Sequence, residues 1–265
     1  MLSFWIMGCA YRPNHQDVIP KHDTFELVSE VVHETRVLNV WLPEGYQEGQ
    51  DSFAVLYMPD GGIKEDFPHI ANTLAALIAN KEIPPLILVG IENTVRGRDL
   101  TGFSNAIDYD SKYAPVTDGA KEFRAFIATE LVPAIDSRYR TKSKKGLVGE
   151  SLAGLFVVET LLNQPDLFDC YIAMDPSLWW NDNYLVKNAA TQLEKFPTKN
   201  IQFWFAGSAV QDISKHTNQL AKVLETNAPS SLKWQYSDEP NEKHSTIFRA
   251  TKEKAFRWAL AALAD

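Results

Sequence analysis

The chain has 265 residues, of which 45% are hydrophobic and 11% aromatic, enough for one large core. Its formal net charge is −8, without a long run of like charges, which argues against a nucleic-acid-binding protein because such proteins present a basic face. The two cysteines, Cys9 and Cys170, supply neither a disulfide framework nor a zinc site, and no apolar run is long enough to span a membrane.

The first residues resemble the end of a bacterial lipoprotein signal, in which Cys9 would carry the lipid. However, no positively charged residues precede the apolar stretch, which is also short for a signal peptide. Two readings follow. Either the true start lies upstream and the protein is a lipid-anchored or periplasmic bacterial protein, or the match is fortuitous and the protein is cytoplasmic. We treat residues 1–23 as an N-terminal segment and residues 24–265 as one domain.

The first third of the domain alternates between strand and helix patterns. Alternating apolar residues over 24–42 predict two antiparallel strands with a turn near Glu34. Apolar runs at 53–58 and 86–91 predict buried strands, with a helix over 70–79 between them. Residues 96–119 show little periodicity, and a loop of that length inside a compact domain is usually functional.

The rest of the chain continues the alternation. An amphipathic helix is predicted over 120–139, interrupted near Pro133. Further strands are expected at 146–148, 168–174, 201–207 and 232–236, with helices at 155–162, 184–195, 214–224 and 246–263. This order predicts an α/β protein with a mostly parallel sheet, antiparallel N-terminal strands and helices on both faces.

A serine stands between the strand at 146–148 and the helix that follows it, in the sequence GESLAG at 149–154. The pattern resembles the nucleophile elbow G-x-S-x-G of α/β-hydrolases, with Ala153 in place of the last glycine. Small residues at Gly149 and Ala153 would let strand and helix pass close together, so that the oxygen of Ser151 projects from the sheet edge. The helix N-terminus would then direct amide groups at an oxyanion.

A serine nucleophile needs a histidine base, which an acid orients. In the α/β-hydrolase topology the chain order is serine, acid, histidine, and only His216 and His244 follow Ser151. His244 lies in the loop before the last helix, where this topology requires the base. His216 lies at a helix start.

The acid is expected after the strand at 201–207, where Asp212 precedes a helix. Asp212 could equally serve as the N-cap of that helix. Asp238, Glu239 and Glu242 are further candidates because they lie close to His244 in the sequence.

The oxyanion hole of such a site needs two donors. The residue after the nucleophile, Leu152, supplies one backbone N–H, and the loop after the strand at 53–58 should supply the other. That loop contains Asp60-Gly61-Gly62. We favour the N–H of Gly62, with Gly61 as the alternative. The simpler interpretation of these residues is a plain turn.

Several further segments support a family resemblance, namely VLYMPDGG at 55–62, LVGIEN at 88–93, RGRDLT at 96–101, ELVPAI at 130–135, PSLWW at 176–180 and HST at 244–246. With the serine elbow, they resemble the putative-esterase family of α/β-hydrolases. This family includes enterobactin-type siderophore esterases, feruloyl and acetyl-xylan esterases and S-formylglutathione hydrolase. RGRDLT and PSLWW are most similar to the siderophore-esterase branch, although Glu150 stands where that branch often has histidine.

The resemblance implies an α/β-hydrolase fold and a serine esterase that needs no metal or other cofactor, acting on a small-molecule ester. A siderophore trilactone is the leading candidate. Feruloyl, acetyl-carbohydrate and short-chain esters are the alternatives, as are acyl transfer and an inactive hydrolase fold used as a binding module. The resemblance also leaves open a Ser–His dyad without the acid.

The expected substrate site lies at the loop 96–119 and the segment after the strand at 168–174. Arg96 and Arg98 could meet catecholate or carboxylate oxygens, whereas Tyr109 and Tyr113 could stack on rings, and Trp179 and Trp180 should reach the same rim. In the simpler alternative, Arg98 and Asp99 belong to structural ion pairs and one tryptophan lies in the core.

Overall fold

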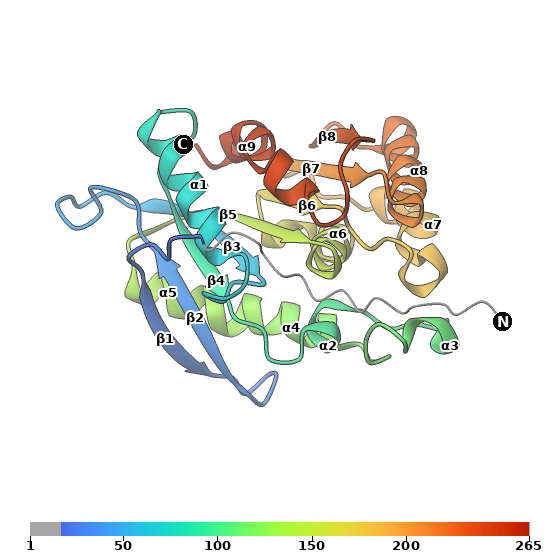
Figure 1. Cartoon of the computed structure of the whole chain (residues 1–265), viewed down its shortest axis with the longest axis horizontal. Coiled ribbons are helices and arrows are strands. Elements are labelled where there is room, and N and C mark those ends of the chain that lie inside the picture. The colour runs from blue at the N-terminus through green and yellow to red at the C-terminus, as the bar shows by residue number, and fades with distance from the viewer. Residues whose placement is uncertain (1–16, 265) are drawn as a thin grey trace.

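An eight-stranded sheet forms the centre of the protein in the computed structural model, which describes residues 17–264 (Figure 1). The strands β1 (Asp23–Val28) and β2 (Thr35–Trp41) form an antiparallel hairpin, and β2 pairs antiparallel with β4 (Leu86–Ile91). All other neighbours are parallel, in the order β1-β2-β4-β3-β5-β6-β7-β8. The remaining strands are β3 (Phe53–Pro59), β5 (Thr141–Glu150), β6 (Cys170–Met174), β7 (Ile201–Ser208) and β8 (Leu232–Glu239). The predicted mostly parallel sheet with an antiparallel start is confirmed.

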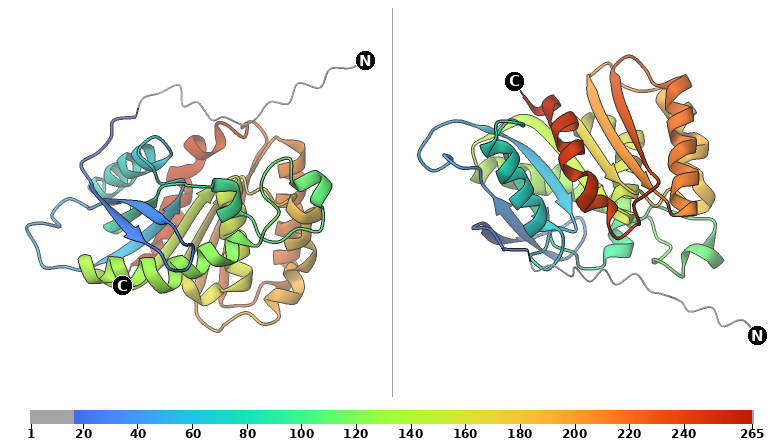
Figure 2. Two further views of the ribbon diagram at one scale, coloured as in Figure 1. Left: turned by 90° about the horizontal axis from the view of Figure 1, so that it is seen from below. Right: turned by 45° about the horizontal axis from the view of Figure 1, so that its top comes forward.

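Helices cover both faces of this sheet, which explains the near-continuous apolar runs in its central strands. Leu56 and Met58 of β3 pack with α1 (Phe67–Ala79) and α9 (Ile247–Ala259), which lie side by side on one face (Figure 2). Val55 and Tyr57 point to the opposite core. That core is closed by α4 (Gly119–Phe126), α5 (Val132–Arg138), α6 (Leu152–Asn163), α7 (Trp180–Leu193) and α8 (Gln211–Asn227).

The loop at 96–119 contains more regular structure than the sequence pattern predicts. It forms two short helices, α2 (Arg96–Leu100) and α3 (Ile107–Asp110). Polar contacts hold them rather than an apolar stripe, so they leave no helical periodicity in the sequence. In α2, buried Asp99 accepts a hydrogen bond from buried Arg36 at 2.7 Å. In α3, the buried carboxylate of Asp110 accepts the Ser104 hydroxyl at 2.5 Å.

Two helices differ in detail from the prediction. The irregularity expected near Pro133 lies just before it, because a π-helical turn at Ile127–Leu131 joins α4 to α5. At the start of α7, Asn181, Asp182 and Asn183 all have left-handed backbone angles, with φ of 50°, 50° and 53°. The Asn181 N–H donates to Asp110 at 2.8 Å, which ties this turn to the loop carrying α3.

None of the helices within residues 17–264 is long and apolar enough to cross a membrane. Cys9 lies outside the described residues, so its lipidation stays a prediction.

Candidate active site

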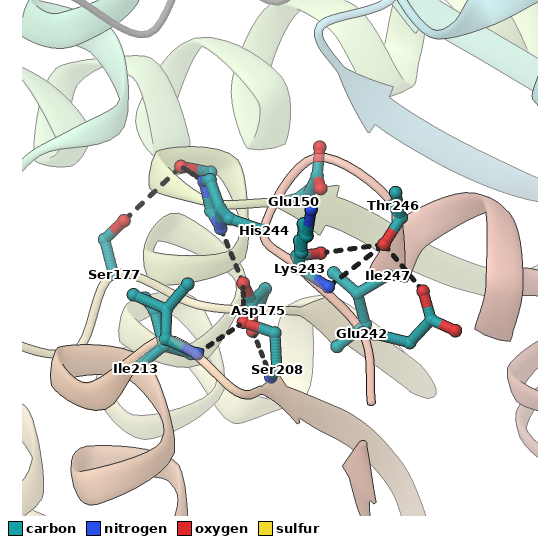
Figure 3. Close-up of polar contacts among 12 residues, drawn as sticks. Glu150, Asp175, Ser177, Ser208, Ile213, Glu242, Lys243, His244, Thr246 and Ile247 are labelled. Carbon is teal, nitrogen blue, oxygen red and sulfur yellow. Dashed lines mark hydrogen bonds and ion pairs between the residues drawn. The ribbon is translucent and has the colours of Figure 1, made fainter. Parts of the chain in front are cut away.

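Three side chains from the carboxyl ends of different strands meet at one edge of the sheet, and two of them, Asp175 and His244, are labelled in Figure 3. Ser151 follows β5, Asp175 follows β6, and His244 lies in the loop between β8 and α9. The His244 Nε2 atom is 3.0 Å from Ser151 Oγ, and its Nδ1 atom is 2.5 Å from Asp175 Oδ2. Ligands of open α/β sheets bind at this edge, so the meeting point is the natural place for a reaction.

The turn at Ser151 is strained in the way a nucleophile elbow requires. Its φ of 60° and ψ of −118° lie where non-glycine residues are rare. A Cβ atom on Gly149 would come within 2.6 Å of the Ala153 backbone, so only glycine fits there. Two hydrogen bonds hold the turn: the Ser151 N–H donates to Met174 O at 3.0 Å, and the Ser177 N–H donates to Ser151 O at 3.1 Å.

Asp175 is fully buried, and its carboxylate is fixed by Ser208. The Ser208 N–H donates to Oδ1 at 2.6 Å and the Ser208 hydroxyl to Oδ2 at 2.8 Å. Because an ionised carboxylate accepts hydrogen bonds only, the contact with His244 assigns the imidazole proton to Nδ1. The Nε2 atom is then free to accept the hydroxyl proton of Ser151.

The expectation that Asp212 is the acid partner of His244 is corrected by this arrangement. Asp212 lies in the first turn of α8, and its alternative role as N-cap falls to Val210. The physical reason is sheet order: β6 neighbours β5 directly, so the residue after β6 lies closer to the nucleophile than one after β7. The sequence did contain a signal, since Asp175 directly follows a buried strand and precedes Pro176.

The other acid candidates near His244 are used elsewhere. Asp238 accepts a long contact of 3.5 Å from the Tyr236 hydroxyl. Glu239 pairs with Lys254 at 3.0 Å, and Glu242 accepts the Thr246 hydroxyl at 2.6 Å. Each therefore stabilises the β8–α9 region rather than the imidazole.

The predicted oxyanion donors differ in availability. Leu152 is the first residue of α6, where an N–H has no acceptor within the helix. The alternative prediction, that Gly61 supplies the second donor, is wrong because the Gly61 N–H already donates to Ile91 O at 2.9 Å. The N–H of Gly62, which we favour as the second donor, donates to Glu65 Oε2 at 2.6 Å. In this structure it is therefore bonded to a side-chain carboxylate.

A network of charged and polar groups positions this loop. Asp60 receives two hydrogen bonds from Arg96, at 2.6 and 2.8 Å, and one from Asn93 at 2.5 Å. Asn93 also donates to Glu65 at 2.8 Å. Burial raises the pKa of Glu65, and the neighbouring charge of Asp60 adds to this effect. Arg96 also approaches Glu150 O at 3.4 Å, which links the loop to the elbow.

Glu150, the residue before the nucleophile, lies half-buried at the same edge. Burial holds the pKa of its carboxyl well above the ordinary range, and Asp66, Asp60 and Asp175 add to the effect against the opposing charge of Arg96.

The predicted substrate-binding residues separate into two groups. Arg98 is bound to Glu34 at 2.5 Å and to Asp99 at 2.8 Å, which supports the structural alternative for this arginine. Trp180 is 4% exposed and donates to Gly102 O at 3.0 Å, so it is a core residue.

Tyr109, Tyr113 and Trp179 form a cluster, which we name the aromatic rim; both tyrosines are exposed, and Trp179 is partly buried against the core. The Tyr113 and Trp179 ring centroids are 4.8 Å apart, and Tyr109 lies 5.3 Å from Tyr113 and 5.9 Å from Trp179. Tyr109 and Tyr113 are 45% and 54% exposed. Trp179 follows Ser177 by two residues, and Ser177 Oγ is 3.5 Å from Ser151 Oγ. The chain therefore connects the aromatic rim directly to the segment that carries Ser177.

A strained serine, a histidine and a buried carboxylate in hydrogen-bond contact at the edge of a parallel sheet have the geometry of a serine-hydrolase triad on an α/β-hydrolase fold. The chain belongs to the putative esterase family, whose model matches residues 29–263. The family predicted from the sequence motifs is confirmed.

Individual relatives agree with this assignment. The chain is 37% identical over 159 residues to the siderophore triacetylfusarinine C esterase of Aspergillus fumigatus, which covers 57% of this chain and 53% of that protein. It is 28% identical over 159 residues to the ferri-bacillibactin esterase BesA of Bacillus subtilis, covering 57% and 55%. The matches thus span about half the length of these relatives. An IroE-like serine hydrolase from Shewanella oneidensis superposes with a TM-score of 0.81 at 28% identity, covering 89% of this chain and 79% of that one.

Proposed function

We propose that this protein is a serine esterase that hydrolyses carboxylic esters through an acyl-enzyme on Ser151. The observation that carries the proposal is the continuous chain of contacts from Ser151 through His244 to Asp175. In acylation, the Ser151 proton moves to His244 Nε2 as Oγ attacks the ester carbonyl. The imidazolium then protonates the departing alcohol, and Asp175 stabilises its charge. In deacylation, water takes the place of the alcohol and the same steps run in reverse.

The carbonyl oxygen of the tetrahedral intermediate needs backbone donors. We assign Leu152 as the first donor and Gly62 as the second, which requires the Glu65 carboxylate to leave the Gly62 N–H when an ester binds. In this proposal Arg96 holds Asp60 and the donor loop in place rather than binding the substrate directly.

For the substrate, we propose an ester with aromatic groups, of the kind found in catecholate siderophore trilactones. Two observations support this class. The similar proteins include a siderophore triacetylfusarinine C esterase and a ferri-bacillibactin esterase, and the aromatic rim offers the exposed rings of Tyr109 and Tyr113. Stacking on such a rim is worth about 0.5–1.5 kcal/mol per ring pair, which is a few-fold to tenfold in kcat/KM.

The test compares kcat/KM for a catecholate trilactone with kcat/KM for an aliphatic p-nitrophenyl ester. The wild type should favour the trilactone, and Tyr113→Ala and Trp179→Ala should each reduce that preference about tenfold while leaving the aliphatic ester within a few-fold. Tyr184→Ala is the matched control, because Tyr184 is 48% exposed and lies outside the rim. Equal rates on both substrates and no effect of either rim variant would show a short-chain carboxylesterase instead.

A further inference from the structure

A second hydroxyl lies beside the nucleophile, on Ser177 in the segment between β6 and α7. Ser177, labelled in Figure 3, is 3% exposed. Its Oγ atom is 3.5 Å from Ser151 Oγ. Within residues 17–264, this is the one hydrogen bond that the Ser177 hydroxyl makes. A buried hydroxyl normally has a hydrogen-bond partner, and Ser151 Oγ is that partner for the Ser177 hydroxyl.

The direction of the bond follows from its neighbours. Nδ1 of His244 carries its proton toward Asp175, at 2.5 Å, so Nε2 has none to give. The single hydroxyl proton of Ser151 is therefore donated to Nε2, at 3.0 Å. Ser151 Oγ has only lone pairs left to offer Ser177. The hydroxyl of Ser177 is the donor, and the nucleophilic oxygen is the acceptor.

The position of Ser177 does not depend on this hydroxyl. Its N–H donates to Ser151 O at 3.1 Å, and its own carbonyl accepts the Trp180 N–H at 3.2 Å. The segment also packs tightly on α6, since a Cβ atom on Gly154 would lie 3.0 Å from Pro176 Cα. Backbone contacts alone therefore hold the Ser177 side chain against the nucleophile, and the hydroxyl can be removed without releasing the loop.

We propose that Ser177 is a further catalytic residue, whose hydroxyl donates a hydrogen bond to Ser151 Oγ while that oxygen carries developing negative charge. This inference rests on the proposed esterase function. In acylation, Oγ gains charge as its proton passes to His244 and loses it as the bond to the carbonyl carbon forms. In deacylation, that bond breaks, the electron pair returns to Oγ, and His244 gives the proton back.

A donor at this place acts on the transition states more than on the resting enzyme. A contact of 3.5 Å to a neutral hydroxyl is weak, whereas a bond to a charged oxygen is shorter and roughly twice as strong. Contacts of this kind are often long before substrate binds and tighten in the transition state. Only such a differential contact raises the rate of the chemical step.

The test removes the hydroxyl and then restores it in a matched pair of variants. Ser177→Thr and Ser177→Val add almost the same volume, but only threonine keeps the donor. With p-nitrophenyl acetate, stopped-flow measurement separates the burst of acylation from the later turnover that reports deacylation. We expect Ser177→Ala and Ser177→Val to slow both phases by about tenfold or more, and Ser177→Thr to stay within a few-fold of the wild type. Thermal unfolding of Ser177→Ala should match the wild type.

Equal losses in the threonine and valine variants, or an unchanged rate in Ser177→Ala, would overturn the inference while leaving the esterase function intact. Should Ser177→Val not fold, Ser177→Cys replaces it, because cysteine is close to serine in size and is a weak donor. A wild type that hydrolyses no ester overturns the proposed function first, and the role of Ser177 with it.

Discussion

Single residues decide the chemistry of this site, and the sequence identifies them unequally. The local turn pattern identifies Ser151, and the order of residues along the chain identifies His244. Both signals are present in the linear sequence. The acid cannot be found that way, because several carboxylates follow the serine. Which of them reaches the imidazole depends on the strand that neighbours β5, and this places Asp175 rather than Asp212 at Nδ1.

The two aspartates provide a direct comparison. Asp175→Asn removes the acceptor that orients His244 and stabilises the imidazolium, so kcat should fall by about 10³–10⁴. Asp212→Asn is the matched control and should stay within a few-fold of the wild type, since Asp212 lies in the first turn of α8. The measurement is steady-state turnover of p-nitrophenyl acetate, with circular dichroism to check folding. A large loss in Asp212→Asn and none in Asp175→Asn would reverse the assignment.

At the scale of elements, the sequence predicts the type of each strand and helix better than the contacts of the loops between them. Apolar runs and amphipathic periodicity identify β3, β4, β7 and the helices around them. The structure of the loop at 96–119 is harder to predict, because α2 is fixed by a buried ion pair between Arg36 and Asp99. These two residues lie 63 positions apart in the sequence. The same network binds Arg98, which favours a structural role for its side chain.

The turn from Gly62 to Glu65 makes a prediction of its own. Freeing the Gly62 N–H requires breaking a bond to a carboxylate, which is worth about 1.5–3 kcal/mol. Glu65→Ala should therefore raise kcat/KM for small esters several-fold, because the oxyanion no longer competes with a negative charge. Lys64→Ala, an exposed change in the same turn, should have no such effect.

The measurement is kcat/KM of the purified wild type, Glu65→Ala and Lys64→Ala with p-nitrophenyl acetate. A lower kcat/KM in Glu65→Ala would mean that Glu65 supports the donor loop. It would contradict the proposal that substrate binding frees the Gly62 N–H to serve as an oxyanion donor.

At the scale of the whole molecule, one sheet edge gathers the site. Ser151, Asp175 and His244 follow three different strands, and the donor loop and the loop at 96–119 follow two more. Parallel pairing brings these carboxyl ends to one side, so residues up to 93 positions apart come within 3.0 Å. The mostly parallel sheet could be predicted from the alternation of elements. The spatial order, in which β4 lies between β2 and β3, could not, because crossovers leave no local pattern.

The most direct test of the central claim, that His244 activates Ser151 as a nucleophile, is intact-protein mass spectrometry after treatment with a fluorophosphonate. Such reagents trap an activated serine as a covalent phosphonate, whereas an ordinary serine hydroxyl does not react. We predict one adduct per wild-type chain, located by peptide mapping on Ser151, no adduct on folded Ser151→Ala, and much slower labelling of His244→Ala. An unlabelled wild type, or equal labelling of the wild type and Ser151→Ala, would contradict the account.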